Sequence, residues 1–238
     1  MMPLEAQLPF LNEKGHVVSL VGGGGKTTLL YAMARCCAAK GWRVLVSTTT
    51  HIQRPETGWV QTREERNAHW NSGTYAVAGL PAEHGKLKSL RMEQLRLWMQ
   101  GADLVLLEAD GAKRLPCKVP AEHEPVLIPE SDVVLAVAGL SAGGRPLQEV
   151  CFRLEQACTL LDAAPETLLT PPLLAKLLAS EEGGRKNVQN RTFYAVLNQA
   201  DTPQRRMFGE ETQQILQKNY AIRCIRTAFK EEERAGAN

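Results

Sequence analysis

Four consecutive glycines followed by a lysine and two threonines are the residues of this chain best suited to chemistry. The stretch follows the apolar run Val17–Val21 and comprises Gly22, Gly23, Gly24, Gly25, Lys26, Thr27 and Thr28. Glycine allows positive φ angles and a close approach of the main chain to phosphate, and a helix that starts here adds partial positive charge. Lys26 would reach the β- and γ-phosphates, and the Thr27 hydroxyl would hold Mg²⁺. The stretch predicts a phosphate-binding loop for a nucleoside triphosphate.

The full pattern of such a loop places another glycine five residues before Gly25, where this chain has Leu20. That glycine shapes the exit from the strand, and we expect Gly22 to Gly24 to supply the same freedom. The departure leaves a second hypothesis open, that of a nucleotide-gated scaffold without turnover.

Two acidic residues follow the most apolar segment of the chain. Glu108 and Asp110 come directly after Leu104–Leu107, so they would emerge beside the glycine loop and hold Mg²⁺ directly or through water. Because they are two residues apart, their side chains point the same way on an extended chain. The sequence does not separate their roles: one could bind the metal while the other positions a water molecule.

Two further polar segments are candidates for substrate binding or switching. The first follows a predicted strand and contains Thr49 and Thr50, whose hydroxyls suit metal-bound water or a γ-phosphate, and His51, which could polarise a substrate. The second follows the acidic strand end and is rich in cations and prolines, which predicts an ordered loop facing an anion. Its candidate residues are Lys113, Arg114, Lys118, His123 and Glu124.

Asn198 and Asp201 follow a later predicted strand. Guanine-specific proteins carry Asn-Lys-x-Asp at such a place, and Gln199 stands here where they have lysine. This degraded motif slightly favours GTP over ATP as the ligand, and a plain turn at the strand end fits equally well.

Strand and helix patterns alternate along the chain, which predicts an α/β fold with a mostly parallel sheet covered by helices on both faces. We expect one P-loop nucleotide-binding domain over residues 1–238, with 139–190 as a candidate helical insertion, and a frayed charged tail over 230–238. The expected strands are Val17–Val21, Arg43–Ser47, Tyr75–Ala78, Leu104–Glu108, Val133–Ala138, Thr192–Leu197 and Ala221–Arg226. The expected helices include Thr27–Lys40, Leu90–Gln100, Leu147–Leu161 and Pro203–Lys218.

Composition narrows the class of protein. The 28 basic and 26 acidic residues nearly cancel, which argues against broad binding to nucleic acid or membranes. No apolar stretch approaches the roughly 18–20 residues that span a bilayer, and residues 1–12 do not read as a signal peptide. Six scattered cysteines without a Cys-x-x-Cys pair favour reduced thiols in a cytoplasmic protein.

The glycine loop, the Thr48–His51 segment and the run Glu108–Pro125 together resemble the selenium-dependent hydroxylase accessory proteins, the YqeC-like family. The run Glu108–Pro125 is the most specific part. The resemblance implies a P-loop nucleotide-binding protein linked to maturation of selenium-dependent molybdenum hydroxylases. It points to the glycine loop, to Thr48–His51, and to Glu108, Asp110, Lys113, Lys118, His123 and Glu124.

These observations favour a Mg²⁺-dependent NTPase that binds ATP or GTP and assists a molybdenum hydroxylase or a cofactor-maturation protein. A small-molecule kinase that uses the same site is an alternative, with the loop after the acidic strand end presenting the acceptor. The scaffold without turnover is the other alternative.

Overall fold

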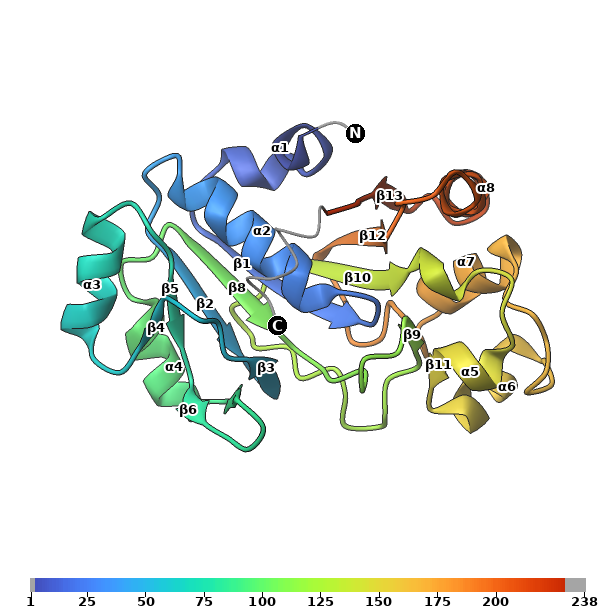
Figure 1. Ribbon diagram of the computed structural model, residues 1–238, viewed down its shortest axis with the longest axis horizontal. Coiled ribbons are helices and arrows are strands. Elements are labelled where there is room, and N and C mark those ends of the chain that lie inside the picture. The colour runs from blue at the N-terminus through green and yellow to red at the C-terminus, as the bar shows by residue number, and fades with distance from the viewer. Residues whose placement is uncertain (1–2, 230–238) are drawn as a thin grey trace.

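The computed structural model describes residues 3–229 of the chain. The predicted frayed tail at 230–238 lies outside these residues. Figure 1 shows a central sheet with helices packed on it.

Eight parallel strands form the main sheet in the order β13-β12-β10-β1-β8-β2-β5-β4. This confirms the predicted fold class. The strands are β1 (His16–Gly22), β2 (Val44–Thr48), β4 (Trp59–Val60), β5 (Ala76–Ala78), β8 (Leu104–Glu108), β10 (Val133–Gly139), β12 (Thr192–Asn198) and β13 (Arg223–Arg226).

Successive residues of a strand point to opposite faces of the sheet. Because both sets of residues are apolar here, helices pack on both faces. Leu135 of β10 packs in a core with Leu29 and Leu30 of α2 (Lys26–Ala38), below α1 (Leu4–Gln7) and η1 (Pro9–Asn12). Its neighbour Ala136 packs on the opposite face with α7 (Pro171–Ala179) and α8 (Pro203–Tyr220). Towards β4, the same face carries α3 (Arg63–Asn71) and α4 (Met92–Met99).

The strand order places the end of β1 at a switch point. β1 lies between β8 and β10, and the chain leaves β1 for β2 on one side but later builds β10 and β12 on the other. Loops at the carboxyl ends of the strands diverge at such a point and leave room for a ligand. The glycine loop between β1 and α2 therefore lies at the position where parallel sheets bind ligands.

Short elements surround this edge of the sheet. β3 (His51–Gln53), β7 (Lys86–Lys88) and β6 (Leu80–Pro81) form a three-stranded antiparallel sheet that the sequence did not predict. The predicted helix Leu147–Leu161 is wrong. It divides into α5 (Leu147–Val150), β11 (Cys151–Phe152) and α6 (Leu154–Leu161), because Arg153 takes a left-handed conformation and β11 pairs with β9 (Cys117–Lys118). η2 (Leu140–Ala142) follows β10.

None of the helices formed by residues 3–229 is both long and apolar enough to cross a bilayer.

An ion pair ties the amino ends of two central strands together, at the edge away from the glycine loop. Asp103, just before β8, accepts hydrogen bonds from the Arg43 main chain at 2.9 Å and from its guanidinium Nη2 at 3.0 Å. Lys14 lies 3.5 Å from the same carboxylate. Hydrogen bonds from the Arg43 side chain lower the pKa of Asp103 to about 2.

The Asp103 carboxylate should contribute stability that depends on pH. Because its folded pKa is depressed, the contribution is present above the unfolded pKa of about 3.9 and is lost as pH falls towards 2. We expect Asp103→Asn to lower the urea midpoint at pH 7 and to leave it nearly unchanged at pH 2. The exposed Glu166→Gln is the matched control. An equal loss for Asp103→Asn at both pH values would contradict this account.

Candidate functional site

The glycine loop turns sharply because three of its glycines have positive φ angles. They are 96° at Gly22, 72° at Gly24 and 101° at Gly25, which is the N-cap of α2. A Cβ on Gly22 would collide with the Val137 carbonyl of β10, and a Cβ on Gly24 would collide with the Gly139 amide. Only glycine fits these positions, which explains the composition of the loop. Leu20 does not shape the strand exit; it is fully buried within β1.

The main-chain amides of the loop fall into two groups. The Gly22 amide donates to Asp110 Oδ2 at 2.9 Å, the Gly23 amide to the Val137 carbonyl at 2.8 Å, and the Gly24 amide to the Leu115 carbonyl at 3.2 Å. The amides of Gly22, Gly23 and Gly24 therefore do not face a phosphate in this conformation. The next four amides, of residues 25–28, have no acceptor among residues 3–229. They lie at the start of a 13-residue helix, where an anion is favoured.

Lys26 is buried beneath this loop among oxygen atoms. Its Nζ donates to the Gly22 carbonyl at 2.6 Å and lies 3.1 Å from Asp110 Oδ1 and 3.7 Å from Glu108 Oε1. Burial alone would lower the pKa of Lys26, but the charges of Asp110 and Glu108 outweigh it and raise that pKa. Lys26 is therefore a charged ammonium held at the helix start.

Glu108 and Thr27 form the oxygen pair that suits a metal ion. The Thr27 hydroxyl donates to Glu108 Oε2 at 2.7 Å. Burial raises the pKa of Glu108, with Lys26 and Thr27 opposing it, so an added cation next to this carboxylate would offset its desolvation. Mg²⁺ prefers oxygen ligands and often takes only one or two carboxylates together with substrate phosphates. The donor set of this chain fits such an ion.

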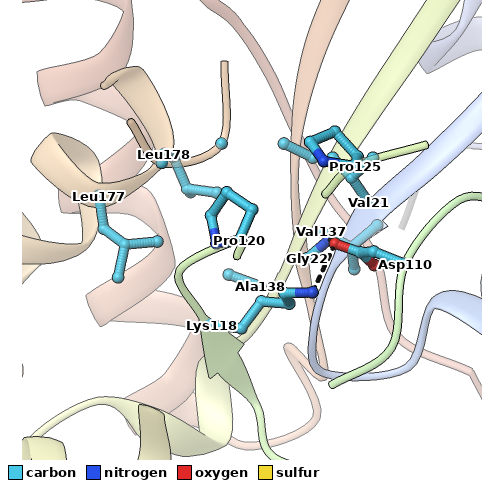
Figure 2. Close-up of a pocket in the computed structure, with 13 residues that line it drawn as sticks. Val21, Gly22, Asp110, Lys118, Pro120, Pro125, Val137, Ala138, Leu177 and Leu178 are labelled. Carbon is cyan, nitrogen blue, oxygen red and sulfur yellow. Dashed lines mark hydrogen bonds and ion pairs between the residues drawn. The ribbon is translucent and has the colours of Figure 1, made fainter. Parts of the chain in front are cut away.

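Asp110 has a different role from Glu108, which the sequence could not separate. Its Oδ2 accepts from the Gly22 amide and lies 3.0 Å from Lys118 Nζ, while its Oδ1 faces Lys26. Figure 2 shows the Asp110 carboxylate turned towards Gly22 and towards the end of the Lys118 side chain. Asp110 Oδ2 is thus hydrogen-bonded to the glycine loop, whereas the buried Oδ1 has no hydrogen-bond donor among residues 3–229 and is held by the charge of Lys26. These contacts tie Asp110 to the loop.

The prediction that the loop after the acidic strand end faces an anion is wrong for Lys118 and Glu124. Lys118 is fully buried, and its Nζ donates to the Gly111 carbonyl at 2.7 Å and to Glu124 Oε2 at 2.7 Å. Lys118 and Glu124 can both be buried because their opposite charges neutralise each other, and neither side chain faces solvent. Arg153 also pairs with Glu124, at 2.8 Å. Sequence reasoning missed Arg153, because it placed this residue inside an unbroken helix.

The other three candidate residues of that loop, Lys113, Arg114 and His123, are exposed. Lys113 places its Nζ 5.1 Å from the centre of the Phe152 ring. Lys113 and Arg114 both have positive φ angles, of 46° and 64°, in the turn that brings the Leu115 carbonyl onto the glycine loop. These cations stay candidates for contact with a bound anion.

The threonine segment is tied to the neighbouring strand end. The Thr48 hydroxyl donates to the Glu108 carbonyl at 2.8 Å and also accepts from the Thr50 amide. The Thr49 hydroxyl donates to the Val126 carbonyl at 2.7 Å. His51 is exposed on β3 opposite Lys88. The segment thus positions the main chain at Glu108, and none of the described contacts joins His51 to Lys26.

Asn198 ties the glycine loop to the end of β12. Its Nδ2 donates to the Gly24 carbonyl at 2.9 Å, and its Oδ1 accepts from the Thr227 hydroxyl at 2.9 Å. Asp201 lies at the start of α8, 3.3 Å from Arg205 Nη1. Both ends of the Asn198 amide have a protein partner, and one hydrogen of Nδ2 remains available. A role of Asn198 and Asp201 in nucleotide binding therefore stays a prediction.

A small cavity adjoins Asp110 and Lys118. Figure 2 shows its walls, which include Pro120, Pro125, Leu177 and Leu178. Its volume is about 10 Å³, room for roughly one water molecule. The polar groups at its floor, Asp110 and Lys118, are already paired, so this cavity does not admit a second substrate in this conformation.

Removing the Asn198 tether should destabilise the protein. Asn198→Ala leaves the buried Thr227 hydroxyl and the Gly24 carbonyl without their partner, so we expect the free energy of unfolding to fall by about 1–3 kcal/mol. Urea denaturation measures this change. Asn71→Ala, at an exposed position on α3, is the control and should change nothing. Equal stability of Asn198→Ala and the parent would contradict the tether.

Comparisons with known proteins place this chain in a family. Two solved structures of the hydrogenase maturation factor HypB share 11% identity with it and cover 94% of it. The protein from Archaeoglobus fulgidus (87% of that chain covered) has a TM-score of 0.41, and the protein from Helicobacter pylori in complex with nickel (84% covered) has 0.42. This likeness is too distant to inform function.

A relative from Escherichia coli K12, described as uncharacterized protein YqeC, is 34% identical over 181 residues, or 72% of this chain and 71% of its own. The profile of the family described as YqeC protein matches residues 18–155, and the chain therefore belongs to the YqeC family.

Proposed function

We propose that this protein is a Mg²⁺-dependent NTPase that binds a nucleoside triphosphate at the start of α2. The observation that carries the proposal is the buried Lys26 ammonium beside four unpaired amides at residues 25–28. A helix N-terminus with a neighbouring buried cation is a site for phosphate oxygens.

The contacts favour separate roles for the two acids. Glu108 and Thr27 would hold Mg²⁺, which supplies charge stabilisation for the transferring phosphoryl group when it is bound. Asp110 holds Lys26 and Gly22 in place. Lys26 and the amides of residues 25–28 would bind the phosphates. The threonine segment supports the strand end that carries Glu108.

The biological role is proposed from family membership and from the resemblance of Glu108–Pro125 to selenium-dependent hydroxylase accessory proteins. We propose that the protein acts in the cytoplasm on a molybdenum hydroxylase or on a protein that matures its cofactor. Its six cysteines are all free thiols, which supports a reducing compartment. We further propose one nucleotide-binding domain over 1–238 with a helical insertion at 139–190.

The placement of Lys118 and Glu124 disfavours the kinase alternative. That hypothesis requires their loop to present an acceptor to the γ-phosphate, yet both side chains are buried and paired with each other. The scaffold alternative keeps one supporting observation, because three loop amides are already bonded to the protein. Steady multiple turnover by the purified protein would exclude it.

Lys26→Ala should weaken triphosphate binding at least tenfold, because charge-assisted hydrogen bonds contribute roughly 1.5–3 kcal/mol each. Isothermal titration calorimetry with ATP and GTP measures this change and also gives the preferred base. Circular dichroism checks the fold of the variant, and the exposed Lys86→Ala on β7 is the matched control. Parent-like affinity of a folded Lys26→Ala protein for both nucleotides would refute the assignment.

Thr27→Val tests the metal site, because valine keeps the shape of threonine and removes the hydroxyl. We expect triphosphate affinity to fall several-fold in Mg²⁺ and to stay nearly unchanged in EDTA. Thermal shift in both buffers measures this, since a ligand of the folded state raises the melting temperature according to its affinity. A similar loss in both buffers would argue against metal binding at Thr27.

A further inference from the structure

A line of alternating charges runs from the glycine loop to α6. It starts at Lys26, passes to Asp110 at 3.1 Å and to Lys118 at 3.0 Å, and continues to Glu124 at 2.7 Å and Arg153 at 2.8 Å. The first four side chains are at most 9% exposed, while Arg153 is 18% exposed. Arg153 is thus the end of the line that lies nearest to solvent.

Arg153 is held in a conformation that is costly for its residue type. Its φ of 66° is left-handed, a conformation that is unfavourable for a residue other than glycine. Three contacts hold the side chain. Arg153 Nη1 lies near Glu124 and donates to the Val119 carbonyl at 3.3 Å, and the guanidinium carbon lies 4.5 Å from the centre of the Phe152 ring. A strained residue with several fixed partners is a reason to seek a function.

We propose that Arg153 is a positioning residue for the nucleotide site, acting on Asp110 through Glu124 and Lys118. This inference rests on the proposed function, because its effect on kcat requires the protein to turn over a nucleoside triphosphate. Arg153 touches neither Asp110 nor Lys26 among the described contacts, so its effect must pass through the two intermediate side chains.

Charge balance explains how the effect travels. Lys118 has three donors, and its partners are the Gly111 carbonyl, Glu124 and Asp110. Without Arg153, Glu124 keeps Lys118 as its only ion-pair partner and draws that ammonium towards itself. Asp110 then loses part of its hold on Lys118 and shifts towards Lys26 and the Gly22 amide. Such a shift of Asp110 would move Lys26, the lysine that we propose to bind the phosphates.

The kinetic test compares Arg153→Gln with Arg153→Lys. Gln removes the charge, and Lys keeps it at a similar length. We expect Arg153→Gln to lower kcat about tenfold with KM for the triphosphate within about twofold, and Arg153→Lys to restore most of the loss. Arg145→Gln is the matched control and should leave both constants unchanged. Within residues 3–229, the exposed Arg145 forms its ion pair with Glu149, which is half exposed.

A second test does not depend on nucleotide. Urea midpoints are measured for Arg153→Gln, for Asp110→Asn and for the double variant. Asp110→Asn removes one of the two negative charges of the line and so adds to its excess of positive charge, and removal of Arg153 should therefore cost less there. We expect the midpoint shift caused by Arg153→Gln to be at least halved in the Asp110→Asn background. The same cycle with Arg145→Gln should be additive.

The outcomes separate this inference from the proposed function. Additive midpoints for Arg153 and Asp110 overturn the inference whatever the kinetics show. Coupled midpoints with parent-like kcat and KM also overturn it, since the line is then structural only. Coupled midpoints in a protein that binds no nucleotide refute the proposed function and support the ordering of Asp110 by Arg153. If Arg153→Gln does not fold, Phe152→Leu replaces it in the cycle, because the Phe152 ring is one of the contacts that hold the Arg153 guanidinium. Additive midpoints for Phe152→Leu and Asp110→Asn would then overturn the inference.

Discussion

Buried charges that must neutralise one another are the constraint on which the candidate site depends. Lys26, Lys118 and Arg153 face Glu108, Asp110 and Glu124, and the six formal charges sum to zero. An unpaired charge in such an interior would cost several kcal/mol, so each residue fixes its neighbours. The six charged side chains already have partners, whereas the amides of residues 25–28 at the start of α2 can still donate hydrogen bonds to an anion.

The fold supplies the setting for this network. Parallel strands bring the ends of β1, β8 and β10 to one edge, and the switch in strand order opens the loops there. The glycine loop then passes so close to β10 that no side chain fits at Gly22 or Gly24. Asn198 ties the same loop to β12, and Thr227 continues that connection beyond β13. The site is therefore built from strands that are distant in sequence.

Much of this could be predicted from local patterns. The apolar runs predicted the buried strands, and the order of strand, glycines and Lys26 predicted the turn into a helix. Glu108 and Asp110 both emerge beside the glycine loop, as the apolar strand before them predicted, and their contacts with Lys26 were not foreseen. The pairing of Lys118 with Glu124 could not be predicted, because cations next to prolines look alike whether they face solvent or a carboxylate. Arg153 was missed for a related reason: the apolar spacing of Val150, Leu154 and Cys158 reads as one helix, and only tertiary contacts reveal the break.

The central claim is that an anion binds at the amides of residues 25–28 above a charged Lys26. Amide-resolved NMR of the ¹⁵N-labelled protein during titration with a non-hydrolysable Mg²⁺–triphosphate tests it most directly. The account predicts saturable shifts that are largest at Gly25, Lys26, Thr27 and Thr28. Saturable shifts centred elsewhere, with these four amides unmoved, would contradict it.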